Sequence, residues 1–213
     1  MSTTEARGPV KANITVSVDG YVAGPDDHGG RGLGVGGERL HYWVMGGPWT
    51  YDNQPEPGAG MADEDRAYFD ELLAGTGACL CGRGMYDSAG AWGGRNPFNA
   101  PLVVLTHRTG DQPDPSTGFL MVDGFDEALA AARRAAGGGG VAIAGGADII
   151  RQALRAGVVD ELAITTAPVA LGHGKRLFEG FDRDLDLEIR AVHRSRYAVH
   201  VRYGVGRRAR SID

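Results

Sequence analysis

The chain has 213 residues and a formal net charge of -5, which argues against general attraction to nucleic-acid phosphates or anionic lipid. Hydrophobic residues make up 42% and charged residues 23%, close to the average of soluble globular proteins, so neither a disordered nor a fibrous class fits. The N-terminus has no apolar signal core, and no segment is long and apolar enough to cross a bilayer. We therefore expect a cytoplasmic protein without nucleic-acid or membrane partners.

The length fits a single domain with one core. We expect this domain to cover residues 11–206, between a flexible N-terminus at 1–10 and a solvated basic tail at 207–213. Residues 24–60 are rich in Gly, Pro and polar residues, and only the apolar run at 40–45 interrupts them. A loop of this length in a compact domain is functional or mobile, so we interpret it as an insertion.

In the first half of the chain, residues 11–18 (KANITVSV) are rich in β-branched residues and predict a strand that ends at an Asp-Gly turn. A short strand continues at 21–23. Residues 62–73 carry acids in their opening turn and apolar residues at helical spacing, which predicts a helix. Residues 77–81 predict a strand that leads directly into the start of the next helix at Arg83.

The second half alternates strands and helices, which indicates an α/β sheet that is mostly parallel. Residues 101–106 (PLVVLT) are apolar at consecutive positions, so this strand should be covered on both faces and lie centrally. We predict further strands over 141–144 and 160–167, helices over 125–136 and 148–156, and a closing antiparallel hairpin of 185–192 with 196–203.

Glycines, arginines and a histidine follow three of the predicted strands. Gly145-Gly146 links a strand to a helix, where free N–H groups and the helix dipole favour a pyrophosphate, although a tight turn without a ligand fits equally well. Gly82-Arg83 and the segment Thr106 to Arg108 follow two other strands. A single arginine there would more often be a surface residue. Open α/β sheets bind ligands at these carboxyl ends, so three such segments together indicate a phosphate-bearing ligand.

These segments occur in the order found in the dihydrofolate reductase superfamily. From ITVSVDGYVAG through GRGMYD, VVLTHR and IAGGADIIRQAL to DELAITTAPVALGHGKRLF, the chain resembles the C-terminal reductase domain of the bifunctional riboflavin-biosynthesis deaminase-reductases. The last two stretches are the most specific. The resemblance implies a dihydrofolate reductase-like three-layer α/β/α fold with a mostly parallel central sheet and a C-terminal antiparallel hairpin, and it implies NADPH as cofactor.

The resemblance also assigns cofactor contacts. Met85 departs from the family pattern, which usually has a hydroxyl residue at this position, so one phosphate hydrogen bond is in doubt. By resemblance, the cofactor phosphates contact Gly82 and Arg83, and the adenosine 2′-phosphate is surrounded by Thr106, His107 and Arg108. By the same resemblance, the pyrophosphate is held by Gly145, Gly146, Ala147, Asp148 and Ile149. The cofactor site is completed by Ala23 and Met85.

Two carboxylates compete for the role of proton donor. Asp65 begins a segment similar to the one that carries the acidic residue of dihydrofolate reductases, whereas Asp19 ends the first strand in the S-x-D-G motif of the riboflavin branch. The alternatives are a solvated helix acid for Asp65 and a turn residue for Asp19. Trp43 and Trp92 are candidates to line the substrate pocket, since flat heterocycles stack on aromatic rings; core packing explains them equally well.

The resemblance implies an NADPH-dependent reductase of a small pyrimidine- or pterin-like substrate, similar to 5-amino-6-(5-phosphoribosylamino)uracil reductase. The histidines show no metal-ligand spacing and the zinc-deaminase signature is absent, so we expect no metal and a stand-alone reductase domain. The alternatives are a non-catalytic nucleotide-binding protein that retains the fold, or a dihydrofolate reductase. We also expect a homodimer, because an apolar strand pair (163–169 and 197–201) would lie at a sheet edge that needs cover. We expect residues 24–60 to act as a lid.

Overall fold

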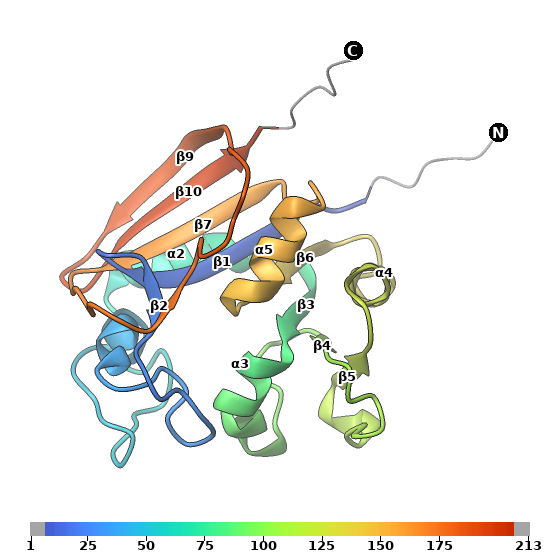
Figure 1. Cartoon of the computed structure of the whole chain (residues 1–213), viewed down its shortest axis with the longest axis horizontal. Coiled ribbons are helices and arrows are strands. Elements are labelled where there is room, and N and C mark those ends of the chain that lie inside the picture. The colour runs from blue at the N-terminus through green and yellow to red at the C-terminus, as the bar shows by residue number, and fades with distance from the viewer. Residues whose placement is uncertain (1–6, 207–213) are drawn as a thin grey trace.

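The computed structural model describes residues 7–206, and within this range an eight-stranded sheet forms the centre of the molecule (Figure 1). The strand order is β5-β4-β3-β6-β1-β7-β10-β9, with parallel neighbours except for β10, which is antiparallel to both β7 and β9. This arrangement confirms a mostly parallel sheet with a C-terminal antiparallel hairpin. The strands are β1 (Val10–Ser17), β3 (Thr76–Gly82), β4 (Leu102–Leu105), β5 (Phe119–Val122), β6 (Gly140–Ile143), β7 (Glu161–Ala167), β9 (Leu187–Arg194) and β10 (Val199–Val205).

One face of the sheet packs against α4 (Phe125–Ala135) and α5 (Ala147–Arg155). Figure 1 shows α5 crossing in front of β1 and β6. Both helices present apolar side chains at helical spacing, among them the fully buried Ala132 and Ile150. The alternating apolar residues of β1, such as Ala12, point to the same side and belong to the same core cluster.

The opposite face is covered in two places. The helix α2 (Asp63–Leu73) packs Tyr68 and Leu72 against β7 and β10, behind the sheet in Figure 1. The helix α3 (Arg83–Ser88) and the following 3-10 helix η2 (Gly90–Gly94) pack against β3, β4 and β5. Helices therefore cover both faces, which confirms the predicted three-layer architecture. Residues of both α2 and α3 line one cavity on this face.

Residues 24–60 are more ordered than their composition predicts. They contain the 3-10 helix η1 (Gly37–His41) and the short helix α1 (Tyr42–Met45). Leu40 is fully buried, and Trp43 and Trp49 are each 7% exposed. The segment therefore packs against the sheet through its few large apolar residues. The ribbon of β2 (Tyr21–Ala23) and β8 (Lys175–Arg176) lies where this segment leaves the first strand.

The sequence did not predict β5 or β8, although it predicted the other strands. The strand β5 has four residues and lies at the sheet edge beyond β4, so β4 is covered on both faces but is not central. The side-chain amide of Gln112 caps this edge, since its Nε2 donates to the carbonyl of Met121 and its Oε1 accepts from the N–H of Met121. The β9–β10 hairpin also begins two to three residues later than predicted, at Leu187 and Val199.

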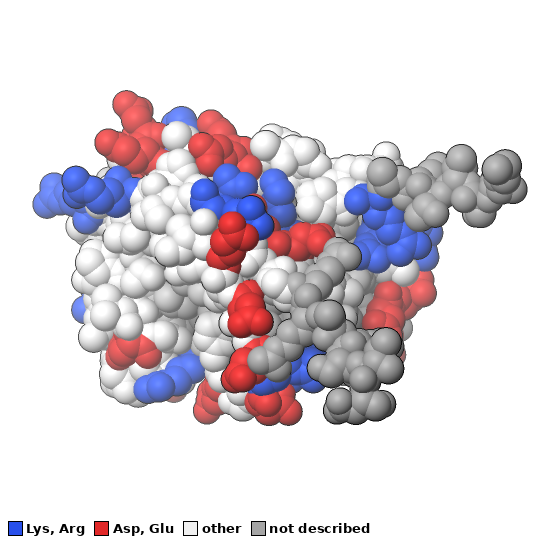
Figure 2. Space-filling view, turned by 90° about the horizontal axis from the view of Figure 1, so that it is seen from above, with Lys and Arg blue, Asp and Glu red and all other residues white. Residues whose placement is uncertain are grey.

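The N-terminal boundary also needs correction. Val10 is fully buried in β1, and the N–H of Val141 donates to the carbonyl of Pro9, so packing begins before residue 11. Residues 1–6 of the predicted N-terminal segment and the whole basic tail (207–213) lie outside the described residues. Within the described part, no helix is long and apolar enough to cross a membrane. Figure 2 shows acidic and basic side chains interspersed over one face of the molecule.

Candidate functional site

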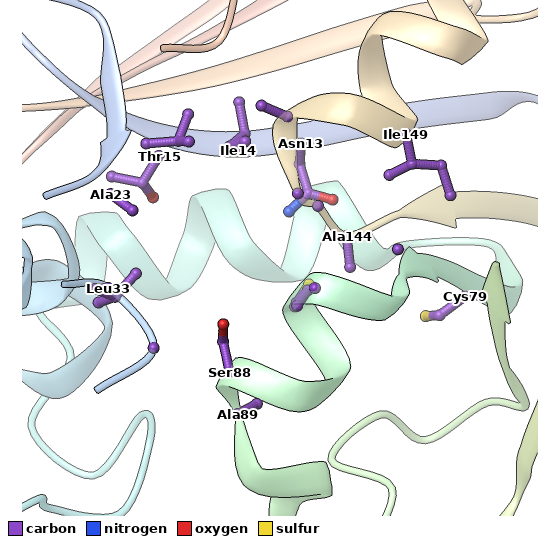
Figure 3. Close-up of a pocket in the computed structure, with 18 of the residues that line it drawn as sticks. Asn13, Ile14, Thr15, Ala23, Leu33, Cys79, Ser88, Ala89, Ala144 and Ile149 are labelled. Atoms are coloured by element: carbon purple, nitrogen blue, oxygen red, sulfur yellow. The ribbon is translucent and has the colours of Figure 1, made fainter. Parts of the chain in front are cut away.

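A cavity of about 1550 Å³ opens where the central parallel strands end. Figure 3 shows side chains from separate elements around one space: Asn13 and Thr15 of β1 on one side, and Ser88 at the end of α3 on the other. Ala23 and Leu33 close the space from the side of the 24–60 segment. The cavity thus lies at the carboxyl edge of the sheet, where ligands bind in open α/β folds.

Gly145 and Gly146 form the connection from β6 to α5 on the cavity wall. Gly145 has φ +122, a conformation that favours glycine, and an added Cβ would lie 3.4 Å from the sulfur of Met85. The first turn of α5 carries backbone N–H groups without helical acceptors and the positive end of the helix dipole. The side chain of Asp148 in this turn is engaged by Gln152, whose Nε2 donates to it at 2.7 Å. The wall is therefore suited to a phosphate group.

Two arginines on the cavity wall share one carboxylate. Arg83, at the start of α3, donates from Nε to Oδ1 of Asp87 at 2.7 Å, and Arg108, after β4, donates from Nη2 to Oδ2 of Asp87 at 2.6 Å. The backbone N–H of Arg108 donates to Oγ1 of Thr106, which fixes the turn after the strand. The structure therefore brings together two guanidiniums that are 25 residues apart in the sequence.

His107 lies at the exposed rim, with its side chain 91% accessible and Nδ1 2.6 Å from Oδ1 of Asp123. Every residue that the sequence assigned to the cofactor lines this one cavity, so the predicted set is brought together in space. These residues are Ala23, Gly82, Arg83, Met85, Thr106, His107, Arg108, Gly145, Gly146, Ala147, Asp148 and Ile149.

Asp19 is not among the residues that line the cavity. Its carboxylate accepts hydrogen bonds from the hydroxyl of Ser17 at 2.6 Å and from the backbone N–H groups of Leu171 and Gly172 at 3.0 and 2.7 Å. These bonds, that of Ser17 foremost, lower the pKa of Asp19 to about 2. Asp19 therefore ties the end of β1 to the loop after β7 and is ionised at neutral pH.

Asp65 does not reach the cavity either. It is fully buried in α2 and is not among the residues that line the cavity. Its Oδ1 lies 2.8 Å from Nε2 of His200 on β10. The second oxygen, Oδ2, is buried without a hydrogen-bond partner. The ring of Trp43 packs edge-on against His200, with ring centroids 4.9 Å apart. The geometry thus places Asp65 behind the cavity wall, where a structural role is favoured.

Both tryptophans assigned to the substrate line the cavity, and they come from two separate elements. The indole N–H of Trp43, on α1, donates to Oγ1 of Thr15 at 3.1 Å. Trp92, in η2, stacks on Phe119 with ring centroids 6.2 Å apart. Each ring therefore contributes to core packing and to the cavity wall at once, and their contact with a substrate stays a prediction.

Sequence reasoning missed several polar residues of the cavity. Asn13 and Thr15 line it from β1, and the strict alternation of KANITVSV was the signal that could have found them. Lys175 and Arg176 line it from β8, and Nζ of Lys175 lies 2.5 Å from Oδ2 of Asp27 in the 24–60 segment. No local pattern predicts that ion pair, because its partners are far apart in the sequence.

Two further ionisable residues of the 24–60 segment line the cavity. Burial lowers the pKa of His41 to about 4, so its imidazole is neutral at physiological pH. Burial also raises the pKa of Tyr51 to about 12, and its hydroxyl donates to the carbonyl of Gly34. Across residues 7–206, no group of three or more His, Cys, Asp or Glu side chains is arranged to hold a metal ion.

Comparison with known proteins agrees with this architecture. The family model described as the RibD C-terminal domain matches residues 9–201. A putative riboflavin biosynthesis protein from Shewanella sp. PV-4 is similar in structure, with 22% identity, a TM-score of 0.68, and coverage of 93% of this chain and 99% of that chain. No curated protein sequence matches the chain.

Two other solved structures share the fold. Dihydrofolate reductase from Enterococcus faecalis, complexed with NADP(H) and RAB-propyl, is 18% identical with a TM-score of 0.59, covering 94% of this chain and 98% of that chain. The diaminohydroxyphosphoribosylaminopyrimidine deaminase/5-amino-6-(5-phosphoribosylamino)uracil reductase from Thermotoga maritima is 16% identical with a TM-score of 0.59. The match to the latter covers 95% of this chain but 58% of that longer chain.

Proposed function

The chain belongs to the family of RibD C-terminal domains, and we propose that it is an NADPH-dependent reductase of a small pyrimidine- or pterin-like heterocycle. Membership of the family supports a reductase of the riboflavin-biosynthesis type. The observation that carries the finer proposal is the convergence of Gly145-Gly146, Arg83 and Arg108 on one cavity. Together they offer backbone N–H groups for a pyrophosphate and guanidiniums for a further phosphate.

The residues of the cavity fit a nicotinamide dinucleotide. Gly145 has φ +122, a conformation that a residue with a side chain adopts only under strain, so the backbone itself would face the pyrophosphate. The turn after β4, fixed by Thr106, and the start of α3 would hold the adenosine end through Arg108 and Arg83. When bound, the cofactor supplies the hydride, and the chain supplies binding and orientation.

The remaining wall suits a flat heterocyclic substrate. Thr15 and Asn13 present a hydroxyl and an amide into the cavity. The aromatic rings of Trp43 and Trp92 also line it. Polar groups on an otherwise apolar wall fix the orientation of a ring through its hydrogen-bonding edge. We infer a substrate related to 5-amino-6-(5-phosphoribosylamino)uracil, on which the Thermotoga maritima protein is described as acting.

The 24–60 segment would exclude water from the reacting centre. Its apolar residues Trp43, Met45 and Trp49 are buried and line the cavity. The ion pair of Asp27 with Lys175 ties this segment to β8. A wall of this kind lowers the local dielectric and keeps water from the nicotinamide. We propose that the segment closes further when the site is filled.

We also propose that the protein forms a homodimer. The predicted strand at the sheet edge needs correction, since β7 lies between β1 and β10 and the edge strand is β9. This edge exposes Ile189 at 64% and Val192 at 57%, and the neighbouring strand β10 exposes Val199 at 44%. An exposed apolar edge is a site for association, and twofold dimers are the commonest soluble oligomers.

The activity is tested by mixing the protein with NADPH and 5-amino-6-(5-phosphoribosylamino)uracil and following the loss of nicotinamide absorbance. We expect oxidation of NADPH that depends on both protein and substrate. Dihydrofolate as the substrate tests the dihydrofolate reductase alternative. Tight binding of NADPH without oxidation by any of a panel of pyrimidines and pterins would instead favour a non-catalytic nucleotide-binding protein.

A further inference from the structure

We propose that Asp87 sets the cofactor preference of the cavity: its carboxylate competes with the 2′-phosphate of NADPH for Arg83 and Arg108 and so lowers selectivity against NADH. This inference rests on the proposed function, because it assumes that the cavity binds a nicotinamide dinucleotide. Asp87 does not line the cavity itself. It acts through the two guanidiniums that do.

Asp87 bridges Arg83 and Arg108, and the geometry of this bridge supports the competition. Asp87 lies one helical turn after Arg83 in α3, and its two oxygens accept from two different arginines at 2.7 and 2.6 Å. The side chain of Asp87 is 42% exposed and that of Arg108 is 59% exposed, so solvent and ligands reach the bridge. The carboxylate therefore engages N–H groups of both guanidiniums that a phosphate could otherwise use.

The charges around the bridge already cancel. Oδ2 of Asp111 lies 3.4 Å from Nη1 of Arg83, in addition to the contacts of Asp87. Two guanidiniums therefore face two carboxylates, and the formal charge of Arg83, Arg108, Asp87 and Asp111 is zero. A phosphate that enters this cluster gains hydrogen bonds but meets no net positive charge, and it also lies close to a carboxylate that repels it.

A ribose hydroxyl meets the opposite situation. The 2′-hydroxyl of NADH carries no charge, so it does not compete with the carboxylate of Asp87 for Arg83 and Arg108 and loses little affinity to that contact. Asp87 thus favours a ribose without a phosphate, whereas the two arginines favour the phosphate. The preference remains for NADPH, because both guanidiniums can still donate charge-assisted hydrogen bonds to the phosphate, but it is smaller than the arginines alone would give.

The other interpretation of the bridge predicts an effect of opposite sign. If Asp87 only holds the two guanidiniums in position for the phosphate, its removal loosens Arg83 and Arg108 and weakens NADPH binding. If Asp87 competes with the phosphate, its removal strengthens NADPH binding. The sign of the change therefore separates a competitor from a positioning residue.

The test measures the affinities of adenosine 2′,5′-bisphosphate and adenosine 5′-monophosphate by calorimetry, for wild type and Asp87→Asn. These probes differ by the 2′-phosphate alone and need no turnover. We expect Asp87→Asn to raise the affinity ratio in favour of the bisphosphate about three- to tenfold at low ionic strength, with a smaller gain in added salt. Asp182→Asn is the matched control, since Asp182 pairs with Arg155 away from the cavity and is replaced in the same way.

An unchanged or lower ratio in Asp87→Asn, with both probes bound, would overturn the role of Asp87 and leave the cofactor site standing. An equal rise in the Asp182→Asn control would also overturn it, because the effect would then follow from net charge. If wild type and Asp87→Asn bind neither probe, the cofactor site itself fails, and this proposal fails with it. Circular dichroism of each variant confirms that the compared proteins are folded.

Discussion

Nε2 of His200 and Oδ1 of Asp65 lie 2.8 Å apart, and neither side chain has any exposed surface. Nδ1 of the same imidazole lies 2.8 Å from Oγ1 of Thr165, and its ring stacks on Tyr68 with centroids 4.0 Å apart. The histidine thus joins α2, β7 and β10 at the back of the cavity wall.

Asp65→Asn separates the structural role of this carboxylate from the role of proton donor. Because Asp65 is buried and partnered by His200, we expect the variant to lose about 1–3 kcal/mol of unfolding free energy in urea. We expect kcat/KM of the folded variant to stay within a few-fold of wild type. Glu64→Gln, at the exposed neighbouring position, is the control for stability. A loss of kcat of about a hundredfold or more would instead identify Asp65 as the proton donor.

Acid should destabilise the protein through His200 and His41. Burial lowers the pKa of His200 below its usual 6.5, against the opposing effect of Asp65, and it lowers that of His41 to about 4. As the pH falls below about 6.5, the unfolded chain takes up these protons before the folded one does, so unfolding free energy is lost. Urea unfolding at pH 7 and pH 5 should show a fall that is smaller in His200→Gln. An equal fall in both proteins would contradict this assignment.

The residues that the sequence assigned to a cofactor lie together on one cavity because each of them follows a local signal. Gly145 and Arg83 come just after the ends of β6 and β3, and the carboxyl ends of parallel strands meet at one edge of the sheet. The fold class followed from alternating strands and helices together with the family resemblance. The bridge from Arg83 through Asp87 to Arg108 was not predictable, because its geometry depends on how α3 lies beside the turn after β4.

The two predicted proton donors show that a sequence motif does not determine what a side chain contacts in the fold. Asp65 has the sequence context of a functional acid, but His200, 135 residues later, determines what its carboxylate contacts. Asp19 likewise accepts hydrogen bonds from Leu171 and Gly172 after the end of β7. The 24–60 segment looked like a structureless loop because its burial depends on a few residues, such as Trp43, that pack against β1 and α2.

Closure of the 24–60 segment predicts a change in hydrogen exchange. We expect exchange across residues 34–48 to slow when NADPH and a substrate analogue are both present, since the apolar residues of this segment line the cavity that the ligands fill. Mass spectrometry of peptic fragments measures it. Unchanged exchange in this range, together with protection at Gly145-Gly146, would keep the cofactor site and remove the lid.

The proposed dimer predicts a mass twice that of the chain. We expect light scattering to give about 45 kDa for wild type, which is double the 22.4 kDa of one chain. Ile189→Lys places a charge on the exposed edge strand and should shift the protein toward the monomer. Leu120→Lys, at an exposed residue of the opposite edge strand, is the matched control and should stay dimeric. The mass of a single chain at high wild-type concentration would contradict the proposal.

We expect the cavity to bind NADPH through the arginines at the strand ends. Fluorescence titration of NADPH and NADH into wild type and Arg108→Ala tests it most directly. Arg108 lines the cavity and offers a phosphate charge-assisted bonds that NADH cannot use, so the variant should lose about tenfold or more in affinity for NADPH and much less for NADH. Absence of NADPH binding to the wild type, or an equal loss of both cofactors in the variant, would contradict the claim.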